Sequence, residues 1–143
     1  MSGVVYTNNA QPCPAGTHGT TFGGSPLACA VGHHVLSRLS SRPSVAHIIE
    51  TSAYLAGRLE LLPKWFPSIL QKDIRGCGLI LGLGFKHEKD PGRVAGMARE
   101  RGVFVLTAGK DAVRIVPSLN VEKEEVDIAV DVIESCLGEL GAT

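Results

Sequence analysis

Aromatic residues, net charge and long apolar runs are all scarce in this 143-residue chain, and each shortage excludes a class of function. One Trp, two Tyr and four Phe are present, so a surface on which nucleic-acid bases stack is not expected. Fourteen basic residues balance fourteen acidic ones, which gives no reason to expect nucleic acid or an anionic membrane as a partner. No apolar run approaches the length that crosses a bilayer.

Paired cysteines and targeting signals are also missing. The four cysteines are scattered and form no C-x-x-C pair, so we expect neither a zinc site nor a disulfide framework, but reduced thiols in an intracellular compartment. Residues 1–15 contain neither a hydrophobic signal core nor an Arg, so no export or mitochondrial leader is visible. The adjacent His33 and His34 would point about 100° apart on a helix. Two ordinary helical histidines are therefore favoured over a metal site.

Glycine is abundant instead, with seventeen residues, and one cluster lies within residues 18–30. Ser25 is a suitable N-cap and Pro26 suits the first helical position, so a helix is expected to begin there. The hydroxyls of Thr20 and Thr21 then lie just ahead of a helix N-terminus, where free N–H groups and the helix dipole favour an anion. Spacing alone favours the simpler alternative, an ordinary glycine loop before a capped helix.

Apolar periodicity predicts four helices and three strands. The first helix, 26–40, is apolar on most sides and is expected to be largely buried; the second is expected to be capped by Ser44 and ended by Pro63. Residues 64–72 are interpreted as a connector. A strand follows at 79–85, and its glycine-bearing face implies that another element packs very close. The remaining elements are expected to be a helix from Asp90 to Gly102, strands at 103–106 and 112–116, and a helix after Asn120.

This order of elements predicts an α+β fold, with helices packed on one face of a small, mostly antiparallel sheet. No internal repeat and no low-complexity tract interrupts it.

The glycine cluster resembles a segment of a known family. His18-Gly-Thr-Thr-Phe-Gly-Gly-Ser-Pro-Leu-Ala-Cys-Ala30 is similar to His-Gly-(Ser/Thr)-Thr-(Phe/Tyr)-Gly-Gly-Asn-Pro-Leu-Ala-Cys-Ala of class III pyridoxal-phosphate aminotransferases. In that family the second Thr reaches across a homodimer interface to the cofactor phosphate of the other subunit. The resemblance therefore implies pyridoxal 5'-phosphate as cofactor and Thr20 and Thr21 as cofactor-binding residues. Ser25 stands where the family usually has Asn, and Thr17 where it often has Asp or Glu.

Two further segments extend the resemblance to about residues 16–140. Residues 73–82 are similar to the family's Val-Arg-Gly-x-Gly-Leu strand, and residues 113–120 to its (Val/Ile)-Arg-(Phe/Leu)-x-Pro-(Pro/Ser)-Leu segment. The Arg of the second segment grips the substrate α-carboxylate in the family, which implies that role for Arg114. A planar guanidinium can bind a carboxylate through two parallel hydrogen bonds. The alternative for Arg114 is an ordinary surface residue on an edge strand.

The resemblance implies the small C-terminal domain of a fold-type I pyridoxal-phosphate enzyme, preceded by a long linking helix. Residues 1–15 would be an irregular lead-in, 16–41 the phosphate loop and linking helix, and 42–143 the small α+β domain. The match is strongest to acetylornithine aminotransferases, especially fungal ones, which implies amino transfer from N-acetylornithine to 2-oxoglutarate in arginine biosynthesis. Ornithine and 4-aminobutyrate aminotransferases are close alternatives. A mitochondrial matrix location is implied for a fungal protein, and a cytoplasmic one otherwise.

The lysine that binds the cofactor in this family is not matched within these residues. The family's cofactor forms a Schiff base with a Lys upstream of the matching segment, and none of the six lysines here corresponds to it. We therefore expect no catalytic residue within this chain, an N-terminal large domain as its partner, and neither transamination nor cofactor binding by these residues alone. A free-standing α+β interaction module and a small anion-binding protein remain alternative hypotheses.

Overall fold

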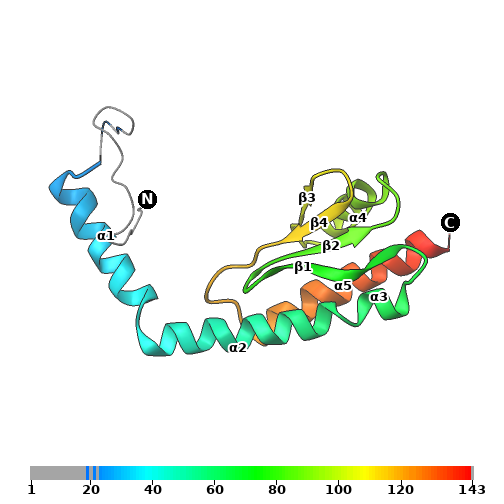
Figure 1. The fold of residues 1–143 in the computed structure, drawn as a ribbon, viewed down its shortest axis with the longest axis horizontal. Helices are drawn as coiled ribbons and strands as arrows, with labels where there is room; N and C mark the ends of the chain where they lie inside the picture. Colours follow the sequence, from blue (N-terminus) through cyan, green and yellow to red (C-terminus); the bar gives the residue numbers. More distant parts are fainter. Residues whose placement is uncertain (1–18, 20, 22, 143) are drawn as a thin grey trace, which may run out of the picture. The chain divides into compact units, whose positions relative to one another are not determined.

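The structure, a computed structural model, describes residues 19, 21 and 23–142 (Figure 1). The chain divides into two compact units, Met1–Ser44 and Val45–Thr143. Along the chain the elements are α1 (Pro26–Leu39), α2 (Arg42–Leu59), α3 (Leu62–Trp65), β1 (Leu70–Cys77), β2 (Ile80–Phe85), α4 (Asp90–Glu100), β3 (Leu106–Ala108), β4 (Ala112–Ile115) and α5 (Lys123–Gly141). None of the helices in the described residues is both long enough and apolar enough to span a membrane.

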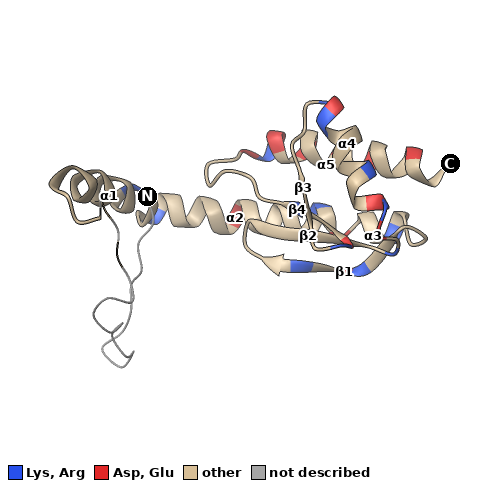
Figure 2. Cartoon of the chain, turned by 90° about the horizontal axis from the view of Figure 1, so that it is seen from above, with Lys and Arg blue, Asp and Glu red and all other residues tan. Residues whose placement is uncertain are grey.

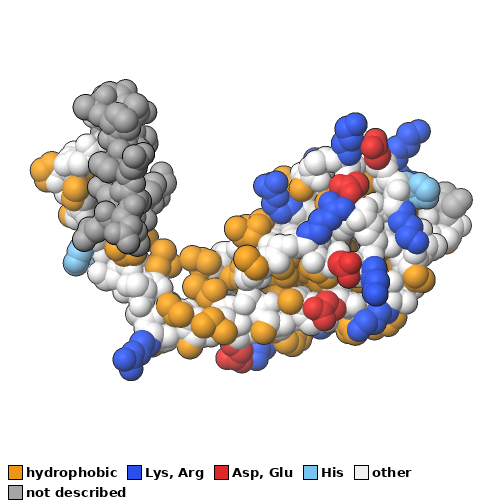
Figure 3. Space-filling model, viewed as in Figure 1, with side chains coloured by type: hydrophobic (Ala, Val, Ile, Leu, Met, Phe, Trp, Pro, Cys, Tyr) orange, Lys and Arg blue, Asp and Glu red, His pale blue; other side chains and the backbone are white. Residues whose placement is uncertain are grey.

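Helix α1 begins where the sequence predicts, but it is not buried. The Ser25 hydroxyl accepts a hydrogen bond from the Ala28 N–H at 3.3 Å, and Pro26 occupies the first turn. No residue of α1 is buried, and its apolar side chains lie on the surface (Figure 3): Leu27, Val31, Val35, Leu36 and Leu39 are each at least 40 % exposed. The prediction of a largely buried helix is wrong because apolar composition buries a helix only where another element covers it.

Helix α2 starts and stops earlier than predicted. It begins at Arg42. The Ser41 hydroxyl accepts a hydrogen bond from the Ser44 N–H at 3.4 Å, so the side chain of Ser41 rather than that of Ser44 binds a free N–H of the first turn. It ends at Leu59, whereas Pro63 lies in the first turn of the short helix α3. Proline is tolerated in a first turn because the N–H that it lacks has no partner there.

The four strands form one antiparallel sheet in the order β1-β2-β4-β3. The α+β architecture with a small antiparallel sheet is confirmed. Strand β1 was not predicted as a separate strand: its first three residues fall in the predicted connector 64–72, and of the segment 73–82 that resembles the family's strand, only the part from residue 79 was predicted as a strand. Its burial does not alternate regularly, and its register shifts between Leu70 and Ile74, so the two-residue period of a strand is absent from the sequence. Strand β3 lies at 106–108, later than the predicted 103–106.

The core lies between one face of the sheet and the helices of the second unit, which lie together on one side of it (Figures 1 and 2). Leu81 and Leu83 of β2 stand in register with Ile115 and Val113 of β4 on this face, and all four are buried. Helix α5 covers them with an apolar stripe made of Val126, Val130, Ile133, Cys136, Leu137 and Leu140. This stripe has the helical spacing on which the prediction of a helix after Asn120 depends.

The glycine-bearing face of β2 is partly open, contrary to the expectation that another element packs against it. A Cβ on Gly84 would come within 2.8 Å of the Gln71 side-chain oxygen, so the close neighbour there is a side chain of the adjacent strand β1. A Cβ on Gly82 would meet only ordinary contacts, the nearest at 3.7 Å. The sheet therefore has one face covered by helices and a second face that carries the functional candidates.

Candidate carboxylate-binding site

Arg114 lies on the open face of the sheet. Its neighbours in β4, Val113 and Ile115, are 0 % and 7 % exposed because alternate residues of a strand point to opposite faces. Arg114 itself is exposed. Within the described residues its guanidinium has no hydrogen bond and no ion pair. The sequence-based alternative was a surface Arg on an edge strand. Arg114 does lie at the surface, but β4 is an inner strand that pairs with β2 on one side and β3 on the other, so the edge position is wrong.

A second arginine lies on the same face, in the same row of residues across the sheet. Arg75 of β1 pairs with Gly82 of β2, and Gly82 pairs with Arg114 of β4. Directly opposed residues of adjacent strands point to the same face, so two cationic side chains flank a glycine. The absence of a side chain at Gly82 leaves the space between them open.

This row forms the floor of an open hollow of about 350 Å³. Its charged lining consists of Arg75, Asp111 and Arg114, and the rest is backbone and small or apolar side chains. The volume lies at the lower end of the range of small-molecule sites, roughly 300–1,000 Å³. Two positive groups and one negative group give the hollow a net positive charge, which suits an anion.

Asp111 is the carboxylate of this hollow, and Arg75 binds it with two hydrogen bonds. Arg75 Nη1 donates to Asp111 Oδ1 at 3.1 Å, and Nη2 donates to Oδ2 at 2.6 Å. The amide of Gln71 donates to Asp111 Oδ2 at 3.1 Å and to the Phe85 carbonyl at 2.8 Å. Hydrogen bonds from Arg75, and then from Gln71, lower the pKa of Asp111 to about 2, so it is ionised at neutral pH.

Arg114 could be identified from its sequence segment, but Arg75 and Asp111, which line the same hollow, and Gln71, which contacts both of them, could not. Arg75 lies within the segment that resembles the family, and Asp111 lies in the turn before β4. Their proximity depends on the pairing of β1 with β2 and of β2 with β4. No local pattern encodes that pairing, particularly since β1 carries a register shift.

The candidate phosphate loop lies in the first unit. Thr20 falls outside the described residues, whereas Thr21 is described and exposed. Gly24 adopts a φ of +76°, which favours glycine, and Ser25 then caps α1. An exposed hydroxyl ahead of a helix N-terminus is chemically suited to a phosphate oxygen, so the described residues fit the phosphate of the expected cofactor. Thr21 and Arg114 belong to different units.

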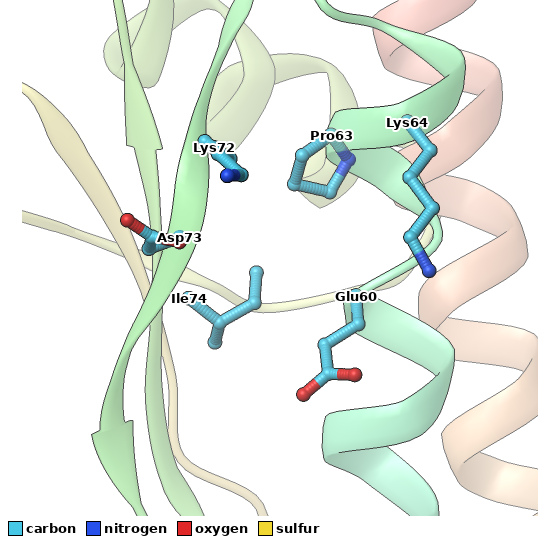
Figure 4. Close-up of a pocket in the computed structure, with 6 residues that line it drawn as sticks. All are labelled: Glu60, Pro63, Lys64, Lys72, Asp73 and Ile74. Atoms are coloured by element: carbon cyan, nitrogen blue, oxygen red, sulfur yellow. The ribbon is translucent and has the colours of Figure 1, made fainter.

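A second hollow, of about 380 Å³, lies beside β1 in the second unit (Figure 4). Its lining combines two lysines and two carboxylates with two apolar residues: Glu60, Pro63, Lys64, Lys72, Asp73 and Ile74. Two positive and two negative groups line it, so its net charge does not select one class of ligand (Figure 4). We assign it no function.

Two solved structures that share this fold are aminotransferases. The N-acetylornithine aminotransferase of Stenotrophomonas maltophilia superimposes with a TM-score of 0.72 at 29 % identity, over 82 % of this chain and 32 % of that one. The ornithine aminotransferase of Plasmodium yoelii gives a TM-score of 0.76 over 89 % of this chain and 33 % of its own, at 24 % identity, which supports the fold alone. The architecture is therefore that of part of an aminotransferase.

The chain belongs to the class-III aminotransferase family, whose pattern it matches over residues 3–137. Intact members of this family use pyridoxal phosphate. The chain is 38 % identical to the mitochondrial acetylornithine aminotransferase of Yarrowia lipolytica, over 90 % of this chain and 30 % of that protein. It is 40 % identical to that of Neurospora crassa, over 92 % of this chain and 28 % of that protein. The chain thus spans less than a third of the length of these two relatives.

Proposed function

We propose that this chain provides the substrate-carboxylate and cofactor-phosphate contacts of an acetylornithine aminotransferase. The reaction would transfer the δ-amino group of N-acetylornithine to 2-oxoglutarate. Residues 16–41 would form the phosphate loop and linking helix, and residues 42–143 the small C-terminal domain. The observation that carries the proposal is the guanidinium of Arg114, which has no partner among the described residues and lies on the open face of the sheet, within a segment that resembles the family's carboxylate-binding strand.

Arg114 would bind the α-carboxylate of the substrate. Its two flanking residues are anchored in the core, so the strand holds the position of the guanidinium. Charge-assisted hydrogen bonds contribute about 1.5–3 kcal/mol each, and a bidentate pair also fixes the orientation of the bound acid. The other arginine of the hollow, Arg75, is already engaged by Asp111, so Arg114 is the available donor there.

Thr21 would donate its hydroxyl hydrogen bond to the phosphate of pyridoxal phosphate, with Thr20 as the second candidate. By the family pattern, the phosphate belongs to the cofactor of the other subunit of a homodimer. When bound, the cofactor supplies the electron sink on which amino transfer depends. The role of this chain is then to hold the phosphate and the substrate carboxylate.

The lysine that carries the cofactor would come from outside these 143 residues, because none of the six lysines matches it. The apolar residues exposed along α1 fit a helix that packs on another part of the enzyme. We therefore expect these residues alone to be inactive. The mitochondrial labels of the fungal relatives support a matrix location if the protein is fungal.

The test replaces the matching C-terminal part of the Yarrowia lipolytica enzyme with this chain and measures transamination of 2-oxoglutarate by N-acetylornithine. We expect an active chimera in which Arg114→Gln raises the KM for 2-oxoglutarate about a hundredfold, as two charge-assisted hydrogen bonds are lost. Arg99→Gln, an exposed arginine of α4, is the matched control and should leave the KM unchanged. Equal KM values for the two variants would contradict the role of Arg114.

The amino donor is tested in the same chimera. We expect N-acetylornithine to give a higher kcat/KM than ornithine or 4-aminobutyrate. A preference for either of the latter two would assign the chain to that branch of the family instead. Turnover by the 143 residues alone, with added pyridoxal phosphate, would contradict the proposal that the cofactor lysine lies elsewhere.

A further inference from the structure

The open face of the sheet places an anionic group beside the candidate carboxylate site. Asp111 and Arg114 both line the 350 Å³ hollow, and Asp111 immediately precedes the strand that carries Arg114. A protein carboxylate that reached the Arg114 guanidinium, which has no partner among the described residues, would compete directly with a substrate carboxylate. Among the described residues that line the hollow, Asp111 is the one acid.

Asp111 does not pair with Arg114 because β1 holds it. Arg75 provides two charge-assisted hydrogen bonds, and Gln71 provides a third contact to the same carboxylate. Arg75 Nη2 also donates to Gln71 Oε1 at 2.6 Å, so the two side chains are held together. The backbone adds to this arrangement, because the Phe85 N–H donates to the Asp111 carbonyl at 2.6 Å.

The register of the sheet separates the two arginines. Arg75 and Arg114 are two strands apart in one row, with Gly82 between them, which puts their backbones about 10 Å apart. Asp111 is drawn to the Arg75 side of this row. The Arg114 side of the hollow thus keeps its positive charge although the hollow contains an acid.

We propose that Arg75 is a positioning residue that holds the Asp111 carboxylate away from Arg114 and so keeps the Arg114 guanidinium available for a substrate carboxylate. The importance of this arrangement for catalysis rests on the proposed function of Arg114. The arrangement itself is a property of three side chains on the sheet and can be tested without the cofactor.

Loss of Arg75 has a specific consequence under this proposal. Asp111 would keep only the neutral amide of Gln71 and would turn toward the remaining guanidinium, that of Arg114. This new ion pair would be intramolecular, so it competes with dissolved carboxylates at a high effective concentration. If Arg75 had only a structural role, its loss would give Asp111 no new partner.

The first experiment follows the pKa of Asp111 in the 143-residue chain by carboxyl NMR. In Arg75→Gln we expect the Asp111 pKa to remain about one unit below its value in Arg75→Gln/Arg114→Gln, because an opposite charge nearby lowers a carboxyl pKa. Equal pKa values in these two variants would overturn the inference, since Asp111 would then not reach Arg114. This outcome is independent of whether Arg114 binds any substrate.

The second experiment titrates the same chain with glutarate, a dicarboxylate, and follows the Arg114 side-chain N–H signal. We expect Arg75→Gln to weaken glutarate binding about fivefold, the upper range for an exposed ion pair, and Arg75→Gln/Asp111→Asn to restore it. Arg75→Lys, which retains the charge, should weaken binding less than Arg75→Gln. A double variant as weak as Arg75→Gln would overturn the inference.

Arg114→Gln separates this inference from the proposed function. If glutarate binds equally well to the unmodified chain and to Arg114→Gln, the carboxylate role of Arg114 fails. The pKa comparison then still decides whether Arg75 holds Asp111 away from Arg114. If glutarate binding depends on Arg114 but the double variant does not recover, the proposed function stands and the positioning role of Arg75 fails.

Discussion

The two faces of the sheet are built from adjacent residues of the same strands and differ in almost every property. On the face covered by helices, Leu81 and Leu83 meet Ile115 and Val113, and none is more than 7 % exposed. On the open face, one row consists of Arg75, Gly82, Arg114 and Leu106, all of them at least partly exposed. The covered face supplies stability, and the rigidity of its strands positions the charges of the open face.

The largest effect should come from damage to the covered face. Leu83 is 1 % exposed, and Leu83→Ala would remove apolar contacts and leave a cavity, at a cost of about 3 kcal/mol or more in the free energy of unfolding. Urea denaturation of the chain measures this loss. Arg114→Ala on the same sheet is the matched control, and we expect it to change the unfolding free energy by less than about 0.5 kcal/mol. Similar losses of unfolding free energy in the two variants would contradict the conclusion that the covered face, rather than the open face, stabilises the fold.

A smaller effect should distinguish two glycines of the open face. Gly84→Ala would place a Cβ 2.8 Å from the Gln71 side-chain oxygen, so Gln71 would have to move, at a cost of about 1–2 kcal/mol. Gly82→Ala meets only ordinary contacts and should cost less. Thermal unfolding of both variants provides the comparison. Recovery of Gly84→Ala by Gln71→Ala would identify the clash with the Gln71 amide group as its cause, and a failure to recover would exclude that group as the cause.

The smallest effect concerns how the stability contributed by the Arg75–Asp111 ion pair of the open face depends on pH. The pKa of Asp111 is about 2 in the folded chain, below the ordinary value of 3.8, so its ionised form favours folding. This contribution is complete above the ordinary pKa and is lost as the pH falls through 3.8 toward 2. Asp111→Asn should therefore lower the urea midpoint at about pH 6 and lower it less at about pH 2. An equal difference at both pH values would contradict this assignment.

The helices and the strands with regular alternation could be predicted because their signals are local. The Ser25-Pro26 start of α1, the stripe of α5 and the alternation of β2 were each confirmed. Strand β1 was missed as a separate strand because its register shift destroys the two-residue period. The predicted Ser44 cap of α2 was wrong by three residues, since the Ser41 hydroxyl accepts from the Ser44 N–H. Serine side chains at neighbouring positions compete for the same cap, and sequence does not show which one the chain uses.

The candidate site could be predicted only in part. Arg114 was identified through its segment, and its exposure follows from strand alternation. That Arg114 has no partner among the described residues could not be predicted, since Asp111 lies only three residues before it along the chain and is an obvious candidate partner. That Asp111 binds Arg75 instead depends on which strands pair, which is a long-range property.

The sequence by itself determined the family, the order of most elements and the functional candidates Arg114, Thr20 and Thr21, because these depend on residue identity and local spacing. Only the tertiary structure decided that Arg75 and Arg114 share a row across Gly82 and that Arg75 engages Asp111, the one acid among the described residues that line the hollow. The physical reason is that strand register brings distant residues together, and no pattern within one segment specifies the register of its neighbour.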